Sequence, residues 1–181
     1  ALTRLLGKPP MVVGPGVKTG LNIRLTVQTQ VGADIVADAV AALEKFTPPI
    51  ITIDMGTATT SGVISEGRTY EGGLLLPGVN VSLEALSRRA AQLPDISLQH
   101  PKALIGKNTE DCMRSGIMYG SAAMIDGIID RMEAELGAPA SVVATGGLGA
   151  MIAAETKKID IYDANLTLDG MRFVYEKQKG K

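Results

Sequence analysis

The sequence contains very few of the residues that bind soft metals or stack against nucleic-acid bases. Its 181 residues include one cysteine (Cys112), one histidine (His100), four tyrosines, two phenylalanines and no tryptophan. A single cysteine cannot form an internal disulfide, and one histidine beside it does not supply the ligands of a zinc site. Any metal is therefore expected to be a hard cation bound by oxygen atoms. Because rings are few and the net charge is −1, no nucleic-acid partner is expected.

Long hydrophobic runs are also missing. Stretches such as Leu74–Leu76 are far shorter than the ~20 residues that span a bilayer, and no charged-then-apolar leader opens the chain. We therefore expect a cytoplasmic protein with no membrane partner. The chain begins at Ala1 rather than Met, and Leu2, Leu5 and Leu6 have the spacing of a helix face. This pattern predicts that the natural beginning of the protein is missing.

Hydrophobic periodicity predicts an α/β fold. The expected strands are Met11–Val13, Ile50–Asp54, Ala58–Ser65, Arg68–Leu76, Ser141–Ala144 and Ile159–Ile161. The expected helices are Ile35–Phe46, Val81–Leu93, Thr109–Leu136, Leu148–Glu155 and Thr167–Glu176. Short turns join the three strands between residues 50 and 76, which predicts an antiparallel meander, and the later alternation of strands with helices predicts a parallel extension. Two prolines at 48 and 49 end the first long helix, so the main boundary is placed there.

The helix Thr109–Leu136 has the most regular pattern. Its apolar positions recur every three or four residues and predict a core face: Met118, Ala122, Ile125, Ile129, Met132 and Leu136. A second stripe consists of small residues: Gly116, Gly120, Ala123 and Gly127. Glycine weakens a helix, so this stripe predicts that another helix or strand approaches closely, either within the fold or across a dimer.

The segment Ile51–Thr60 has the composition of a phosphate-binding hairpin. A buried strand ends at Asp54, Gly56 permits a sharp turn, and Thr57 with the neighbouring amides can donate to phosphate oxygens. Asp54 would then hold a cation beside those oxygens. An ordinary hairpin, in which Asp54 accepts hydrogen bonds from turn amides, fits the same pattern.

Asp34 is the candidate proton acceptor. It follows Gly32 and Ala33 and precedes a helix, a position from which a carboxylate can take a hydroxyl proton during phosphoryl transfer. The alternative is an N-cap, because aspartate satisfies free amides at helix starts. Asp38 lies one turn further on and either faces the same way or is solvated surface.

The remaining candidates lie in loops and at helix ends. Gly146 and Gly147 follow a strand and precede a helix, which suits either a flat ligand on bare backbone or a tight connection. Thr109 either caps its helix or presents its hydroxyl to a substrate, and Lys107 meets a phosphate or only water. His100 is expected at the surface, and Cys112 is expected to be a small buried apolar residue.

In this order the motifs resemble the type III pantothenate kinase family of the acetate and sugar kinase, Hsp70 and actin superfamily. The stretches that carry the resemblance are Gly14–Arg24, Val31–Asp34, Asp54–Thr60, Gly72-Gly73 with Pro77-Gly78, Ile105–Thr109, Ala144–Leu148 and Leu166–Met171. The resemblance implies a ribonuclease-H-like half of the actin-like ATPase type over residues 48–181, preceded by the remnant of a second such half over residues 1–47.

The resemblance also implies an activity. Family members phosphorylate pantothenate with ATP and Mg²⁺, the first step of coenzyme A synthesis, and require potassium or ammonium. By this resemblance Asp34 accepts the proton, Asp54 binds the monovalent cation, Gly56 and Thr57 contact ATP, and Gly146 and Gly147 lie against its adenosine part. The implied pantothenate-binding residues are Leu25, Gly32, Ala33, Asp34, Ile35 and Thr109. Homodimers with the substrate site near the interface are also implied.

Three features depart from the family pattern. Ile35 stands where the family usually has arginine, and Leu25 stands where it usually has an aromatic residue. The family's first phosphate-binding hairpin, Asp-x-Gly-Asn-Thr, has no counterpart in the chain. Since phosphoryl transfer depends on positioning and charge stabilisation, we expect little or no turnover by this chain alone. The alternative function is a non-catalytic nucleotide- or metabolite-binding regulatory module derived from the family.

Overall fold

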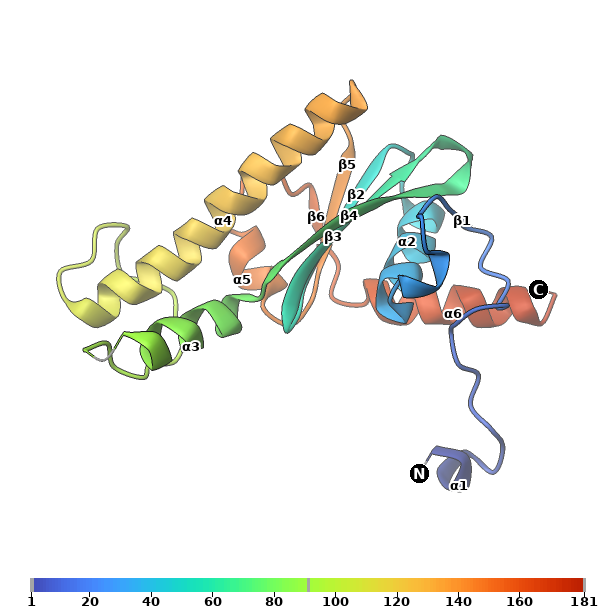
Figure 1. The fold of residues 1–181 in the computed structure, drawn as a ribbon, viewed down its shortest axis with the longest axis horizontal. Coiled ribbons are helices and arrows are strands. Elements are labelled where there is room, and N and C mark those ends of the chain that lie inside the picture. Colours follow the sequence, from blue (N-terminus) through green and yellow to red (C-terminus); the bar gives the residue numbers. More distant parts are fainter. Residues whose placement is uncertain (1, 91, 181) are drawn as a thin grey trace.

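The computed structural model describes residues 2–90 and 92–180, which form one mixed sheet of six strands with helices on both faces (Figure 1). The strands are β1 (Asn22–Ile23), β2 (Ile50–Met55), β3 (Ala58–Ser65), β4 (Thr69–Pro77), β5 (Ser141–Thr145) and β6 (Ile161–Tyr162). The helices are α1 (Leu2–Leu6), α2 (Ala33–Lys45), α3 (Val79–Arg89), α4 (Thr109–Leu136), α5 (Gly149–Ala153) and α6 (Leu166–Gln178), with 3₁₀ turns η1 (Gln28–Gln30) and η2 (Glu66–Arg68).

The sheet confirms the predicted meander and its parallel extension. Its strand order is β1-β4-β3-β2-β5-β6. Strands β2, β3 and β4 pair antiparallel, whereas β5 and β6 add to β2 in parallel. The short strand β1 lies parallel to β4 at the opposite edge. The carboxyl ends of β2 and β5 therefore meet at one end of the sheet.

One predicted strand is wrong. Met11–Val13 forms no strand, and Val12 is 75% exposed. Pro9, Pro10 and Pro15 surround this segment and provide no N–H groups, so a ladder here could extend over only a few residues. The last residue of the segment packs instead against the apolar side of α2.

The sheet separates two apolar layers. Ile51, Ile53 and Met55 of β2 face the layer that includes α4 and α5. Ile50 faces the other layer, which includes α2 and α6. Because successive residues of a strand point to opposite faces, Asp54 lies on the α2 side.

Helix α4 has the predicted bounds and core face. The first four residues of the predicted apolar stripe are buried, and Met132 and Leu136 are half-buried. Gly116, Gly120 and Ala123 are exposed, and a Cβ atom added to either of these two glycines would meet nothing within 4 Å. The close neighbour predicted for this stripe is therefore absent from the described residues. Although α4 has 28 residues, no described helix has the length and apolar content needed to cross a membrane.

Removing one buried hydroxyl is expected to leave the fold intact or stabilise it. The Oγ atom of Ser61 is buried without a hydrogen-bond partner, on the strand face shared with Ile53 and Leu74. An unsatisfied buried hydroxyl costs about 1 kcal/mol or more, so Ser61→Ala should leave the free energy of unfolding unchanged or raise it by about 1 kcal/mol in urea denaturation. Ser115→Ala is the control, since the buried Ser115 hydroxyl donates to the Leu104 carbonyl, and it should destabilise. Equal losses in both variants would contradict this account.

Candidate active site

Carboxylates and hydroxyls gather where β2 ends on the α2 side of the sheet. Asp54 pairs across the sheet with Thr60 of β3 and Thr145 of β5, so the three side chains share one face. Burial raises the pKa of the half-buried Asp54, and the charge of Asp34 raises it further. The fold thus brings Asp34 and Asp54 within electrostatic reach of each other, as the sequence analysis requires for one site.

Asp34 does not cap α2. The helix begins two residues earlier than predicted, with Gly32 at the N-cap position and no side-chain cap, so Asp34 lies in the first turn. Its Oδ1 atom accepts a hydrogen bond from the amide of Ile35 at 2.9 Å, and the side chain is exposed. The N-cap alternative is wrong because Gly32 already adopts the extended backbone of that position. The carboxylate of Asp34 is therefore accessible to a substrate.

Asp38 is buried, so the solvated alternative is wrong for this residue. It is 2% exposed, and the hydroxyl of Thr167 in α6 donates to its Oδ1 atom at 2.6 Å. Burial raises the pKa of Asp38 to about 7, and the charges of Asp54 and Asp34 act in the same direction, while the Thr167 hydrogen bond lowers it. Neither the role of Asp38 nor that of Thr167 was assigned from sequence. The sequence signal that could have indicated this burial is the position of Asp38, one turn after Asp34 on the apolar side of α2.

The buried carboxyl of Asp38 makes stability depend on pH. Its pKa is about 7 in the folded chain and near 3.8 when unfolded, so the folded state binds more protons between these values. The favourable contribution of Asp38 to the free energy of unfolding is complete below pH 3.8 and is lost as the pH rises through 7. Asp38→Asn should therefore raise the free energy of unfolding at pH 8 by about 1–2 kcal/mol, less than the full pKa difference, since the new amide N–H groups also need partners.

Urea denaturation at several pH values measures this effect. Asp95→Asn, in the exposed loop after α3, controls for the loss of one negative charge. An Asp38→Asn variant that is destabilised equally at pH 5 and pH 8 would contradict a raised pKa.

The turn between β2 and β3 is a tight hairpin, as predicted. The Gly56 amide donates to the Ala58 carbonyl at 3.0 Å. A Cβ on Gly78, the N-cap of α3, would collide with the carbonyl of Thr57, so the start of α3 lies directly against the turn. Helix starts carry a partial positive charge. No hydrogen bond from a turn amide to Asp54 is found among the described residues, so the hairpin does not engage that carboxylate.

The two glycines after β5 have different environments. Gly146 has φ +97°, and its carbonyl accepts a hydrogen bond from the Tyr162 hydroxyl at 2.9 Å. A Cβ on Gly146 would lie 2.6 Å from Oδ1 of Asp54, whereas one on Gly147 would meet nothing within 4 Å. The absence of a side chain at Gly146 therefore lets the turn pack directly against Asp54. At Gly147 the backbone is exposed and accessible to a ligand.

Thr109 is not brought to this site within the chain. It begins α4, which starts beyond the sheet beside the loop after α3, whereas α2 lies at the other side of the sheet (Figure 1). Asn108 caps α4 by accepting the amide of Asp111 at 2.9 Å, so the prediction that Thr109 caps this helix is wrong. Asn108 has the extended backbone of a cap, and Thr109 is already helical.

Three other candidates lie away from the carboxylates. His100 is exposed, as expected, and its Nε2 atom is 2.8 Å from Glu155. Lys107 is exposed. Cys112 is also exposed, so the expectation that it is buried was wrong, because it lies on the outer side of the first turn of α4 rather than on the core face.

The residues implied to bind pantothenate lie around the start of α2. Leu25 and Ile35 are half-buried and pack against the apolar cluster between the sheet and α2. Ala33 borders a pocket of about 270 Å³, whose other lining residues are Val13–Val17, Thr19, Leu21, Ile23, Gln28, Thr29, Val31 and Val36. The described residues contain no cluster of three or more His, Cys, Asp or Glu side chains that could hold a metal ion.

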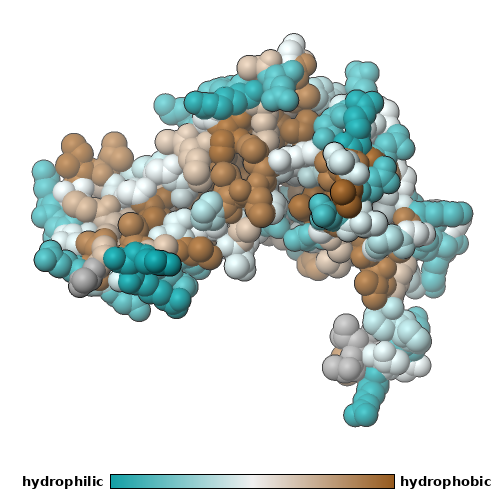
Figure 2. Space-filling view, in the orientation of Figure 1, coloured by the Kyte–Doolittle hydropathy of each residue, from teal (hydrophilic) through white to brown (hydrophobic). Residues whose placement is uncertain are grey.

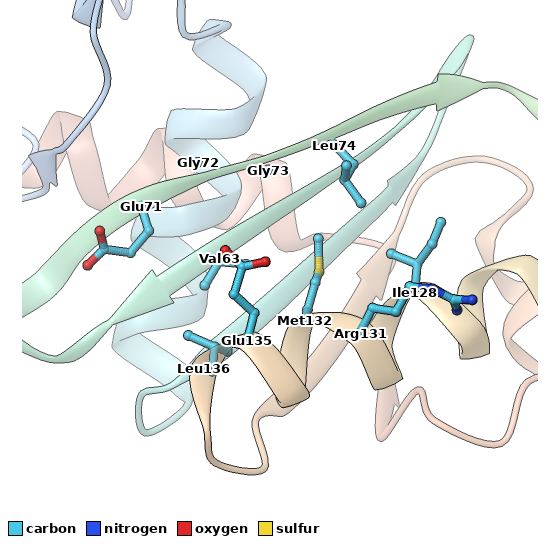
Figure 3. A pocket seen from close by; sticks show the side chains of 10 residues that line it. All are labelled: Val63, Glu71, Gly72, Gly73, Leu74, Ile128, Arg131, Met132, Glu135 and Leu136. Atoms are coloured by element: carbon cyan, nitrogen blue, oxygen red, sulfur yellow. The ribbon is translucent and has the colours of Figure 1, made fainter.

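A second pocket, of about 510 Å³, lies on the opposite face of the sheet (Figure 3). It is formed by the meander and the last turns of α4, with Val63, Leu74 and Met132 among its apolar lining residues. Figure 2, in the orientation of Figure 1, shows hydrophobic surface in the middle of the molecule. This pocket does not include the carboxylates of the candidate active site.

The sheet, the carboxylates Asp34 and Asp54 and the turns at Gly56 and Gly146 define a mixed α/β protein. Its polar site lies at the carboxyl ends of β2 and β5. The family model for type III pantothenate kinase matches residues 1–131. A type III pantothenate kinase from Moorella thermoacetica is 50% identical over 176 residues, which are 97% of this chain and 69% of that protein. One from Halalkalibacterium halodurans is 46% identical over 168 residues, 93% of this chain and 66% of that protein. The chain belongs to the type III pantothenate kinase family and spans about two thirds of the length of these relatives.

A solved structure shares the fold. A conserved Baf family protein from Campylobacter jejuni superposes with a TM-score of 0.61 over 91% of this chain and 72% of that one. The two sequences are 22% identical, so this comparison concerns the fold alone.

Proposed function

We propose that this chain contributes the acceptor site and one phosphate-binding hairpin to the ATP-dependent phosphorylation of pantothenate, the first step of coenzyme A synthesis, in the cytoplasm. The observation that carries the proposal is that Asp34, in the first turn of α2, lies close enough to Asp54, near the end of β2, for its charge to act on that carboxyl group. The family membership supports the substrates, ATP and pantothenate. The proposal includes the ribonuclease-H-like character of the fold and the division into residues 1–47 and 48–181.

Asp34 is the proton acceptor in this proposal. Its carboxylate is exposed at the start of α2, and among the described residues its hydrogen-bond partner is the neighbouring Ile35 amide. It can therefore take the proton of the primary hydroxyl as that oxygen attacks the terminal phosphorus of ATP, while the bond from this phosphorus to the bridging oxygen breaks and ADP leaves. Pantothenate would lie along Gly32–Ile35, beside the pocket that Ala33 borders, with Leu25 contributing apolar contact.

The phosphates of ATP would lie at the Gly56–Thr57 turn. The start of α3 abuts this turn, so amides and a helix dipole favour negative charge there. Gly147, next to Gly146, offers exposed backbone to the adenosine part. Mg²⁺ would arrive bound to the nucleotide, because the described residues have no cluster of carboxylates for a divalent ion.

Asp54 would hold potassium or ammonium. It is a single half-buried carboxylate beside the threonines Thr60 and Thr145, a hard oxygen set of low total charge that fits a singly charged ion. When bound, the ion would neutralise charge next to the phosphates.

Thr109 can reach pantothenate only from a second copy of the chain in this proposal. The start of α4 lies away from α2 within one chain, and Gly116, Gly120 and Ala123 of α4 are exposed. A homodimer formed through α4 would cover the stripe Gly116–Gly127 and could place one copy's Thr109 near the other copy's Asp34.

A coupled ATP-turnover assay tests the proposal. The motif Asp-x-Gly-Asn-Thr does not occur in the chain, so we expect little turnover by the 181 residues alone. Pantothenate-dependent turnover is expected when the chain is extended at its N-terminus by a segment that carries the Asp-x-Gly-Asn-Thr hairpin of the family pattern. Robust turnover by the 181-residue chain would contradict the need for the second hairpin. ATP binding with no turnover by the extended chain would favour the non-catalytic module.

A further inference from the structure

The proposed proton acceptor, Asp34, lies in the first turn of α2, and no side chain caps this helix start. The N-cap residue Gly32 provides no side-chain hydrogen bond, and Asp34 in the first turn is exposed. Free amides at a helix start favour fraying. The position of Asp34 therefore depends on the packing of the residues that follow it in α2, of which Ile35 is the first.

The first buried residue of α2, Val36, packs both against α6 and against the segment that precedes α2, which includes Val13 and Val31. The next residue, Ala37, lies against α6. A Cβ on Gly170 would collide with the carbonyl oxygen of Ala37, so the two backbones touch at this point. Val40 of α2 and Val174 of α6 are fully buried in the same contact. The close approach brings Thr167, one turn before Gly170, to Asp38.

The hydrogen bond from Thr167 to Asp38 joins the buried faces of these helices. Its length is 2.6 Å, and Asp38 lies one turn after Asp34. The ion pairs between α2 and α6 lie at the far end of α2, where Lys45 pairs with Asp169 at 2.6 Å and Glu44 pairs with Lys177 at 2.8 Å. The Asp38–Thr167 bond is thus the polar anchor nearest the start of α2.

We propose that Asp38 and Thr167 form a latch between α2 and α6 that positions the Asp34 carboxylate relative to Asp54. Both are positioning residues, because neither is required to touch the substrate. The charged groups that face Asp38 are Asp34 on its own helix and Asp54 on β2, and α6 presents the uncharged Thr167. The latch itself can be measured without turnover; only its effect on catalysis rests on the proposed function.

Removal of the Thr167 hydroxyl should change both the buried contact at Asp38 and the start of α2. The hydrogen bond lowers the pKa of Asp38, so Thr167→Val should raise that pKa further. Without this anchor the start of α2 should open more often, so the Ile35 amide, which donates to Oδ1 of Asp34 at 2.9 Å, should exchange faster with solvent. A residue that merely fills space would not produce both changes.

NMR titration of the carboxyl carbons of the 181-residue chain tests the latch. In Thr167→Val, the Asp38 pKa should rise, and the Ile35 amide, which reports the Asp34 hydrogen bond, should exchange about tenfold faster. Thr167→Ser retains the hydroxyl and should resemble the parent. Thr156→Val, which removes a hydroxyl bonded to the Ala153 carbonyl, should leave both signals unchanged.

An unchanged exchange rate of the Ile35 amide in Thr167→Val, with the α4 amides intact, would overturn the latch. If Thr167→Val does not fold, Thr167→Ala provides the same comparison with a smaller side chain. In the extended chain, Thr167→Val should lower kcat about tenfold with KM for ATP changed less than about twofold, and Thr167→Ser should restore it. An unchanged kcat would overturn the positioning role. Absence of turnover by the unsubstituted extended chain would reject the proposed function and leave the NMR result to decide the latch.

Discussion

Replacement of Asp34 by asparagine is expected to lower pantothenate-dependent turnover about 100-fold or more in the extended chain, the usual scale for loss of a general base. Asparagine has nearly the same shape, and its amide oxygen can still accept the Ile35 amide. The change therefore removes the ability to take a proton while the start of α2 is preserved. ATP binding should be nearly unchanged, because the nucleotide contacts are assigned to the Gly56–Thr57 turn and Gly147.

Turnover and ATP affinity must be measured separately to interpret this variant. Asp95→Asn makes the same chemical change in an exposed loop and should retain turnover. If Asp34→Asn keeps turnover within about threefold of the parent, far from the loss expected of a general base, Asp34 has only a structural role at the start of α2. If ATP binding is lost as well, the carboxylate contributes to the nucleotide site instead.

Replacement of Gly146 by alanine is expected to lower the free energy of unfolding by about 3 kcal/mol, the sum of backbone strain and overpacking. Its φ of +97° disfavours any residue with a Cβ, and that atom would lie 2.5 Å from backbone atoms of Met55. It would also lie 2.6 Å from Oδ1 of Asp54. The substitution should therefore both destabilise the chain and displace the proposed cation ligand.

The neighbouring glycine provides a matched control. Gly147 has no positive φ, and an added Cβ would meet nothing within 4 Å, so Gly147→Ala should change stability by less than about 1 kcal/mol. Urea denaturation of the two variants measures the difference. Similar losses at both positions would show that the turn tolerates no side chain for reasons other than the contact with Met55 and Asp54.

Local patterns predicted the regular elements well. The bounds Thr109–Leu136 match α4 because the apolar period continues through the whole segment and Asn108 and Gly137 end it in cap conformations. The meander was predictable because short turns leave adjacent strands little choice but to pair. Met11–Val13 has similar composition but forms no strand, because a strand requires a partner that local sequence does not specify.

The candidate site was predicted only in part. Asp34 and Asp54 were recognised from the residues around them, and the fold brings them together. Thr109 carried an equally clear motif, but it lies at a helix start far from α2 in one chain. The spacing of motifs along a chain carries no information about which ones meet, so this difference was not accessible from sequence.

The α/β class, the long helix and the meander follow from the amino-acid sequence, because periodicity and turn residues act over short distances, and the order of the motifs identifies the family. Tertiary contacts determine which aspartate of α2 is buried and which glycine of the 146–147 pair is constrained. Asp38 owes its burial and its hydrogen bond to Thr167, 129 residues further along the chain. Gly146 owes its constraint to β2, against which its turn packs. Both outcomes depend on close contacts between distant segments, and such contacts exist only in the folded chain.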